Sequence, residues 1–266
     1  MTFQKESVFN TAKTWIKDIG QVIRTEIDQP RQIDTKTHPN DLVTEMDKKV
    51  EQFFAEKIRT EYPDHQILSE EGFGDDVKAL SGTTWIIDPI DGTMNFIHQK
   101  RHFAISVAVF HDHIGEIGFV YDVMGDVLYA AKNDEGAYKN DERLQSLDEK
   151  KNLTESIYLF NTLWTTENNI VDDKKIRELV KTVRGVRTYG SAALEFCYLA
   201  EGIADGYVSF TLHPWDFAAG AVILKEVGGV IKHANGRDLT FLTQEPLVAG
   251  HKDVVDRTLT HYIELK

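Results

Sequence analysis

The sequence has 266 residues, enough to bury a large core in one domain or in two tightly packed halves. Its 30 basic and 43 acidic residues leave a formal net charge of −13, which would repel a nucleic-acid backbone or an anionic membrane surface. We therefore expect no nucleic acid and no membrane among its partners. An anionic small substrate would also be repelled unless a bound cation reverses the charge at the site.

The cysteine content and the N-terminal segment predict a cytoplasmic protein. Cys197 is the single cysteine, so no intrachain disulfide can form, and we expect its thiol to be buried on a helix face. Residues 1–20 carry charges throughout and lack the apolar run of a signal peptide. No run of about 18 uncharged apolar residues occurs, so we expect no membrane-spanning helix.

Two amphipathic helices are predicted near the start of the chain. Apolar residues recur at helical spacing between Val8 and Ile23. Thr44, followed three residues later by Asp47, resembles the cap that opens a helix, and an apolar stripe continues from there to about Tyr62.

The following segment has the pattern of strands. The stretches "WIID" (85–88), "FAISVAVF" (103–110), "GEIGFVYD" (115–122) and "DVLYAAK" (126–132) are rich in β-branched or aromatic residues and are separated by turn-like acids and glycines. We predict neighbouring strands of an antiparallel meander, followed by a polar hairpin and exit loop over 133–146.

The second half alternates helices with strands. The predicted elements are a strand over 156–160, helices over 172–183 and 191–201, a strand over 205–210, a helix over 215–227 and a final helix from residue 252. Charged and amide residues concentrate near 140–155, so we divide the chain into halves 1–145 and 146–266 that form one compact unit. The predicted class is α/β (α+β), with two sub-domains around sheets.

The segment "WIIDPIDGTMNF" places Asp88 and Asp91 three positions apart after an apolar run. Pro89 fixes its own φ and donates no backbone hydrogen bond, so both acids should lie in a rigid turn at the end of a strand. Two carboxylates held apart by the backbone suit Mg²⁺, which prefers oxygen ligands. If a helix begins at Gly92 and Thr93, its amides can hold a phosphate. The alternative is an Asp-Gly turn that only reverses the chain.

Further acids could complete such a site. Glu70 follows an apolar stretch in "ILSEEGFG", Asp216 opens a helix in "HPWDFAAG", and Asp47 lies in the predicted cap. Each has a simpler explanation alone: a solvated loop for Glu70, the helix dipole for Asp216 and capping for Asp47. The set, rather than any single acid, favours a metal site.

Together these stretches resemble the signatures of the inositol monophosphatase family of metal-dependent phosphatases. The sequence contains "SEEG", a match to Asp-Pro-x-Asp-Gly-Thr-x-Asn-Phe, and "WDFAAG" for Trp-Asp-x-Ala-Ala/Gly-Gly, while "DLVTEMD" and "GSAAL" also fit. They occur in the family's order and with its usual separations over about residues 36–229.

The resemblance implies a metal-binding role for each matching acid. Glu70, Asp88 and the backbone carbonyl of Ile90 would bind one Mg²⁺. Asp88 would bridge to a second ion, held also by Asp91 and Asp216, and a third, weaker ion would lie near Glu70 through waters. The first half would thus carry most metal ligands.

The resemblance also implies contacts to phosphate and water. The amides of Gly92 and Thr93 would hold the phosphate, and the Thr93 hydroxyl, oriented by Asp47, would help to position the attacking water. Lys36 would be a loop lysine near the site. Two ions about 4 Å apart would activate the nucleophilic water and stabilise the departing alkoxide, so Glu70, Asp47 and Thr93 are the expected catalytic residues.

Substrate choice is expected to depend on the second half. The "GSAAL" segment resembles the family's sugar-facing segment, with Gly190, Ser191 and Ala192 as predicted contacts. Ser209 stands where animal-type inositol phosphatases carry a glutamate that contacts inositol hydroxyls. The reaction predicted from the resemblance is therefore hydrolysis of inositol monophosphate or a related small sugar or polyol phosphate, with NADP(H), 3′-phosphoadenosine 5′-phosphate and fructose 1,6-bisphosphate as alternatives.

The resemblance finally implies a layered α-β-α-β-α sandwich, a homodimer, two to three Mg²⁺ ions per site and inhibition by Li⁺. A non-catalytic binding or regulatory protein that keeps the fold is the rival hypothesis. The intact set of metal-binding acids argues against that rival.

Overall fold

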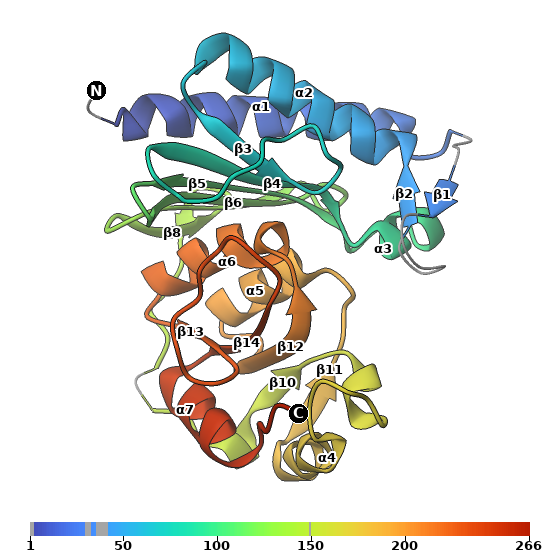
Figure 1. The fold of residues 1–266 in the computed structure, drawn as a ribbon, viewed down its shortest axis with the longest axis vertical. Helices are drawn as coiled ribbons and strands as arrows, with labels where there is room; N and C mark the ends of the chain where they lie inside the picture. The colour runs from blue at the N-terminus through green and yellow to red at the C-terminus, as the bar shows by residue number, and fades with distance from the viewer. Residues whose placement is uncertain (1–2, 30–32, 36–41, 149) are drawn as a thin grey trace.

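The computed structural model shows a protein built of five layers of helices and sheets (Figure 1). The structure describes residues 3–29, 33–35, 42–148 and 150–266. From one end of the molecule to the other, the layers are α1 (Lys5–Glu26) with α2 (Glu45–Glu61), a seven-stranded sheet, α5 (Ala192–Ala200) with α6 (Pro214–Glu226), a five-stranded sheet, and α4 (Asp173–Thr182) with α7 (Lys252–His261). The predicted α-β-α-β-α sandwich is confirmed.

The first helical layer opens as the sequence predicts. The apolar faces of α1 and α2 are buried against the seven-stranded sheet. At the start of α2, the Thr44 hydroxyl accepts hydrogen bonds from the backbone amides of Met46 and Asp47, and the Asp47 carboxylate accepts one from the Thr44 amide at 2.8 Å. Asp47 is therefore the capping acid that its spacing from Thr44 predicts.

The first sheet is the predicted meander with additional strands. Its order is β3-β4-β5-β6-β7-β8-β9, in which β3 runs parallel to β4 and the other neighbours are antiparallel. The polar hairpin predicted over 133–146 contains β8 and β9. The strands are β3 (Gln66–Ser69), β4 (Thr83–Asp91), β5 (Ala104–His111), β6 (Ile114–Asp122), β7 (Val127–Lys132), β8 (Gly136–Lys139) and β9 (Glu142–Arg143).

The predicted end of β4 at Asp88 is wrong, because the strand continues through Pro89 to Asp91. Its register against β5 shifts between Asp88, which faces Ser106, and Asp91, which faces Ala104. This irregularity accommodates the proline, which has no amide hydrogen to contribute to the ladder. Both acids are thus fixed by the sheet itself instead of by a turn beyond it.

The second sheet includes three strands that the sequence pattern did not reveal, β11, β13 and β14. Its order is β11-β10-β12-β14-β13. The strands are β10 (Ile157–Leu159), β11 (Gly185–Arg187), β12 (Gly206–Leu212), β13 (Val230–His233) and β14 (Glu245–Gly250). The proposed division of the chain into 1–145 and 146–266 falls between β9 and β10 and stays a proposal.

Shorter elements complete the chain. They are β1 (Ile33–Thr35) and β2 (Leu42–Thr44), which pair with each other, α3 (Thr93–His98), and the 3₁₀ turns η1 (Leu153–Glu155) and η2 (Thr162–Thr165). None of the helices among the described residues is long and apolar enough to cross a membrane.

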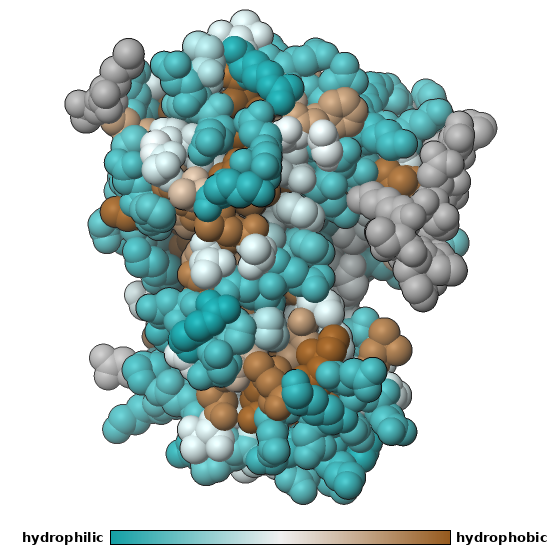
Figure 2. All heavy atoms as spheres, in the orientation of Figure 1, coloured by the Kyte–Doolittle hydropathy of each residue, from teal (hydrophilic) through white to brown (hydrophobic). Residues whose placement is uncertain are grey.

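Three apolar clusters fill the spaces between the layers. The central cluster packs α5 and α6 between the two sheets and includes the Cys197 side chain, which is buried as predicted. The face in Figure 2 is mostly hydrophilic, in keeping with the high content of charged residues.

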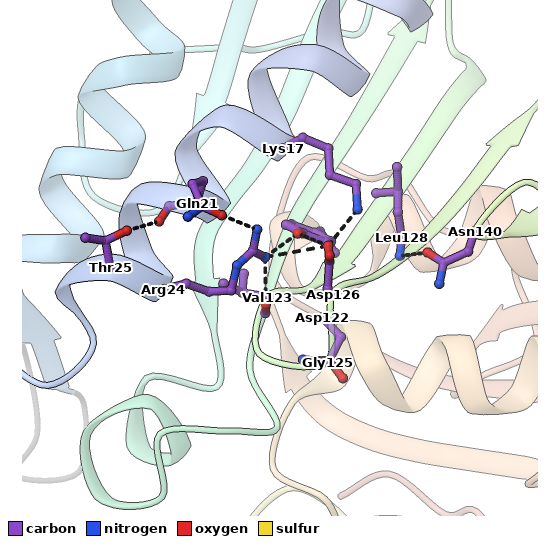
Figure 3. Close-up of polar contacts among 11 residues, drawn as sticks. Lys17, Gln21, Arg24, Thr25, Asp122, Val123, Gly125, Asp126, Leu128 and Asn140 are labelled. Atoms are coloured by element: carbon purple, nitrogen blue, oxygen red, sulfur yellow. Dashed lines mark hydrogen bonds and ion pairs between the residues drawn. The ribbon is translucent and has the colours of Figure 1, made fainter.

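Polar contacts fix the position of α1 on the sheet. In Figure 3, side chains of α1 reach the turn between β6 and β7. Arg24, which also donates to Gln21 of the same helix at 2.8 Å, donates to the carbonyl of Val123 at 2.9 Å, and Lys17 pairs with Asp126 at 2.9 Å. These contacts add directional constraints to the apolar packing of α1.

We expect Gly118→Ala to lower the free energy of unfolding by about 1–3 kcal/mol, a typical cost of overpacking. A Cβ at Gly118 of β6 would lie 2.6 Å from the carbonyl oxygen of Ala219, so the backbone of α6 would have to move. Urea denaturation measures the change. Gly185→Ala on β11 is the control, because its Cβ would meet nothing closer than the end of the Arg187 side chain at 3.4 Å. Equal losses in both variants would contradict this account of the packing.

Candidate metal centre

Three carboxylates from two elements meet between the layers. Asp88 and Asp91 lie on β4, and Asp216 lies in the first turn of α6. One oxygen of each lies within 4.8 Å of the others. The topology, rather than proximity in sequence, therefore assembles the cluster.

Asp88 is a buried member of the cluster with a perturbed pKa. Its side chain is buried, and one carboxylate oxygen accepts a hydrogen bond from the amide of Ile90 at 2.9 Å. Burial, followed by the charges of Glu70 and Asp91, raises the pKa of Asp88 well above its usual value. In the described part of the chain, neither Asp88 nor Asp91 forms an ion pair with a lysine or arginine. A divalent cation fits this arrangement because it would supply the missing positive charge and take oxygen ligands.

The N-terminus of α5 is directed at Asp91. The Asp91 carboxylate accepts hydrogen bonds from the Ser191 hydroxyl, from the Ala193 amide at 2.8 Å and from the Ala192 amide at 3.2 Å. Burial raises the pKa of Asp91 to about 6, although these three donors oppose the shift. The amides and the helix dipole favour the ionised carboxylate, which is the form that binds metal.

Asp216 both caps α6 and lies in the carboxylate cluster. Its carboxylate accepts a hydrogen bond from the His213 amide at 2.8 Å and closes the capping box of α6. The same side chain lies in the cluster with Asp88 and Asp91. Capping and membership of a metal site are thus compatible, and the cap fixes where this carboxylate lies.

Glu70 borders the cluster from the loop that follows β3. Its charge contributes to raising the pKa values of Asp88 and Asp91. It does not belong to the close set of three carboxylates. The structure thus brings Glu70 to the edge of the site that the sequence assigned to it.

Asp47 and Thr93 form a polar pair beside the cluster. The Thr93 hydroxyl lies 3.3 Å from a carboxylate oxygen of Asp47 and 3.1 Å from the carbonyl oxygen of Ile90. A hydroxyl has one proton, so it donates to one of these acceptors at a time. Burial raises the pKa of Asp47 to about 6. This value lies close to neutral pH, where a carboxylate can exchange protons.

Gly92 joins β4 to α3 in a conformation that favours glycine. Its φ is +92°, and a Cβ would lie 3.0 Å from the carbonyl oxygen of Gly190. The predicted helix start is confirmed, since Gly92 caps α3 and Thr93 is its first residue. The close approach also brings the first half of the chain against the segment before α5.

The predicted substrate contacts lie in different settings. Ser191 is buried, and its hydroxyl donates to Asp91, so in this structure it orients a carboxylate. Gly190 and Ala192 lie on either side of it, and Ser209 lies on β12 next to an irregularity in the pairing with β14. Lys36 lies outside the described residues. The substrate roles of these residues stay predictions.

Sequence reasoning missed several residues that support the site. Asn95 donates to the carbonyl of Tyr189 at 2.7 Å and to that of His102 at 2.8 Å, which links α3 to the segment before α5. The buried carboxylate of Glu195 accepts from the Tyr189 amide at 2.5 Å. Asn95 belongs to the matched motif, so the sequence could have indicated its importance. For Glu195 the sequence offered only an acidic residue within an apolar helix.

Comparison with known proteins identifies the group to which this architecture belongs. The model of the "Inositol monophosphatase family" matches residues 4–264. The chain belongs to the inositol monophosphatase family. It is 45% identical over 255 residues to inositol-1-monophosphatase of Bacillus subtilis, with 96% of each chain covered. The predicted family and enzyme class are confirmed.

Solved structures of the family share the fold. Inositol monophosphatase II from Staphylococcus aureus superimposes with a TM-score of 0.88 at 40% identity, covering 97% of this chain and 93% of that chain. A structure described as an IMPase/NADP phosphatase complexed with Mg²⁺ and phosphate gives a TM-score of 0.87 at 26% identity, covering 97% and 95%. The fold of this chain is therefore that of inositol monophosphatases.

We expect Mg²⁺ to stabilise the protein more at pH 8 than at pH 5. The pKa values of Asp88 and Asp91 are raised, so the metal-free folded state binds protons more tightly than the unfolded chain. The contribution of Asp91 to stability is present below about pH 4 and is lost as pH rises through about 6, and that of Asp88 is lost as pH rises through its own raised pKa. Mg²⁺ competes with these protons for the ionised carboxylates, so the stabilisation that it provides grows over the same range.

Thermal unfolding with EDTA or excess Mg²⁺ at several pH values checks this expectation. At 100 times its dissociation constant the ion would add about 2.7 kcal/mol. Asp91→Asn should reduce the Mg²⁺-induced shift, whereas Glu56→Gln on the exposed face of α2 should keep it. A shift that is the same at pH 5 and pH 8 would contradict the assignment.

Proposed function

We propose that the protein is a Mg²⁺-dependent phosphomonoesterase that hydrolyses inositol monophosphate or a related small sugar or polyol phosphate. The observation that carries the proposal is the cluster of Asp88, Asp91 and Asp216, of which the first two are buried, beside the pair of Thr93 and Asp47. A metal-binding cluster alone would suit a binding protein. The adjacent hydroxyl and carboxylate supply what hydrolysis needs, a means to hold a water and receive its proton.

The acids divide the work of holding cations. Asp88, Asp91 and Asp216 would bind one Mg²⁺, and Glu70, Asp88 and the carbonyl of Ile90 would bind another. When bound, the ions would supply positive charge for the phosphate and leaving oxygen and would lower the pKa of a bound water. We propose two to three ions per site and inhibition by Li⁺, which the description of a related staphylococcal enzyme as a LiCl-soaked inhibitory complex supports.

Thr93 and Asp47 would guide the attacking water. The Thr93 hydroxyl donates toward Asp47, so a lone pair on its oxygen can accept a hydrogen bond from water. As the water attacks phosphorus, its proton can move to Thr93 Oγ1 while the threonine proton moves to Asp47. The raised pKa of Asp47, about 6, suits it to this acceptance. The backbone amides of Gly92 and Thr93 would hold the phosphate oxygens.

Inositol monophosphate is the first substrate to test. A crystal structure of the Staphylococcus aureus relative holds inositol monophosphate, and the small residues Gly190 and Ala192 beside the cluster would leave room for a polyol. A 2′-phosphorylated nucleotide is the second candidate, because another structure of that relative holds 2′-AMP. Ser209 stands where a carboxylate would favour inositol, so hydrolysis of a 2′-phosphorylated nucleotide should be measured as well.

We also propose that the enzyme is a cytoplasmic homodimer. A single buried cysteine is compatible with a reducing compartment, and dimerisation follows the family resemblance. Light scattering of the purified protein tests the assembly.

We expect wild-type protein with Mg²⁺ to release inorganic phosphate from inositol 1-phosphate and Asp91→Asn to lose at least about 100-fold in kcat/KM, the scale seen for displaced catalytic groups. Asparagine keeps the size of the side chain but removes the charge that binds the cation. Glu56→Gln should retain full activity. Parallel assays with 2′-AMP and NADP compare the substrate classes. A folded wild-type protein that is inactive on all three would overturn the proposal.

The Thr93 hydroxyl can be tested separately from metal binding. We expect Thr93→Ala to lower kcat by about 100-fold, because the water loses its partner, and Thr93→Ser to restore most of the rate. Calorimetry should give nearly the same Mg²⁺ affinity for both variants. Equal activity of the alanine and serine variants would refute the role of the hydroxyl.

A further inference from the structure

A second buried carboxylate lies on α2 one turn after Asp47. The Glu51 side chain is completely buried, although most acids on this helix face solvent. It forms no ion pair with a lysine or arginine in the described part of the chain. Burying a carboxylate without a positive partner costs free energy unless hydrogen bonds compensate the charge. The groups that donate to Glu51 therefore indicate its structural role.

Among the residues that the structure describes, three hydrogen-bond donors to Glu51 come from the end of β3 and from the loop after it, which carries Glu70. Oε1 accepts from the Ser69 hydroxyl at 2.7 Å and from the Phe73 amide at 2.8 Å. Oε2 accepts from the Glu71 amide at 2.6 Å. The Glu51 carboxylate therefore accepts hydrogen bonds from residues on both sides of Glu70. Two of these donor residues, Ser69 and Glu71, are the direct sequence neighbours of Glu70.

Other contacts hold the far end of the same loop. The Asp75 carboxylate accepts from the Ile67 amide at 2.9 Å, and Arg59 of α2 donates to the carbonyl of Phe73 at 2.7 Å. Neither of these contacts reaches the residues adjacent to Glu70. The pairing of β3 with β4 also holds Ser69, and the Glu51 carboxylate is the side chain that bonds to residues on both sides of Glu70.

We propose that Glu51 is a positioning residue that holds Glu70 at the metal centre. The inference rests on the proposed function, in which Glu70 binds a cation. Because Glu51 follows Asp47 by four residues, both carboxylates lie on the same face of α2. One helix thus orients the Thr93 hydroxyl through Asp47 and the Glu70 carboxylate through Glu51.

The test variant is Glu51→Gln. Glutamine has nearly the same shape, but its amide nitrogen is a donor, so it must face either the Glu71 amide or the Ser69 and Phe73 pair. In either orientation at least one donor meets a donor, and the loop around Glu70 shifts. We expect the Mg²⁺ concentration for half-maximal activity to rise about 10-fold or more, with kcat at saturating Mg²⁺ falling much less.

Two further variants calibrate the result. Ser69→Ala removes one of the three donors and should raise the half-saturating Mg²⁺ concentration by a smaller factor. Glu56→Gln on the exposed face of the same helix changes the same functional group and should leave the Mg²⁺ dependence unaltered. Thermal unfolding in EDTA reports whether the variants remain folded.

The outcome separates positioning from a purely structural role. If Glu51→Gln lowers the melting temperature in EDTA but keeps the Mg²⁺ dependence of the wild type, the proposal is overturned. Calorimetric titration with Mg²⁺ provides a readout that needs no turnover. If the wild type releases no phosphate yet binds Mg²⁺ more tightly than Glu51→Gln, the proposed function fails while the positioning role stands.

Discussion

Mutual repulsion among closely spaced carboxylates, two of them buried, is the constraint on which the rest of this structure depends. Asp88, Asp91 and Asp216 are brought close together. Within the described residues Asp88 and Asp91 have no lysine or arginine ion-pair partner, and the raised pKa values of these two report the cost. Without other forces the cluster would take up protons or move apart. The fold opposes this with backbone geometry: a strand through Pro89, a helix cap at Asp216 and the amides of α5 on Asp91. A rigid array of this kind creates a strong demand for a cation, and a site that demands cations can accept an anionic substrate despite the net negative charge of the chain.

The two sheets each supply part of this array, and the contacts between them are therefore functional as well as structural. β4 belongs to the first sheet, whereas α5 and α6 connect strands of the second. The Ser191 hydroxyl on Asp91 and the Asn95 amide on Tyr189 cross between these parts. Small residues let the layers approach, since Gly118 lies against the backbone of α6. Packing that appears remote from chemistry thus sets the distances between carboxylates.

The sequence predicted features that depend on local patterns and missed those that depend on tertiary partners. Amphipathic helices, the cap of α2 and the meander follow from periodicity and side-chain chemistry. The predicted end of β4 was wrong because a proline usually ends a strand. Only the pairing with β5 reveals the register shift that accommodates Pro89. Strands β11 and β13 have only three and four residues, and β14 begins with Glu-Pro, so none of the three has a clear alternating pattern. The acids of the site were found through motifs, whereas Glu51 and Glu195 resembled ordinary surface glutamates until their loop partners were known.

These buried glutamates explain how a loop-built site can remain ordered. The segments that carry Glu70 and Ser191 are irregular, and irregular backbone leaves amides without partners. Glu51 accepts two such amides and Glu195 accepts the Tyr189 amide, in each case from a neighbouring helix. Each carboxylate satisfies amides that water would otherwise solvate and couples the loop to a rigid element. The proposed metal ligands are consequently held in place by α2 and α5, while the proposed sugar-facing surface near Ser209 can vary without disturbing them. Separate control of metal position and substrate contact is what would allow one fold to serve polyol phosphates and nucleotides alike.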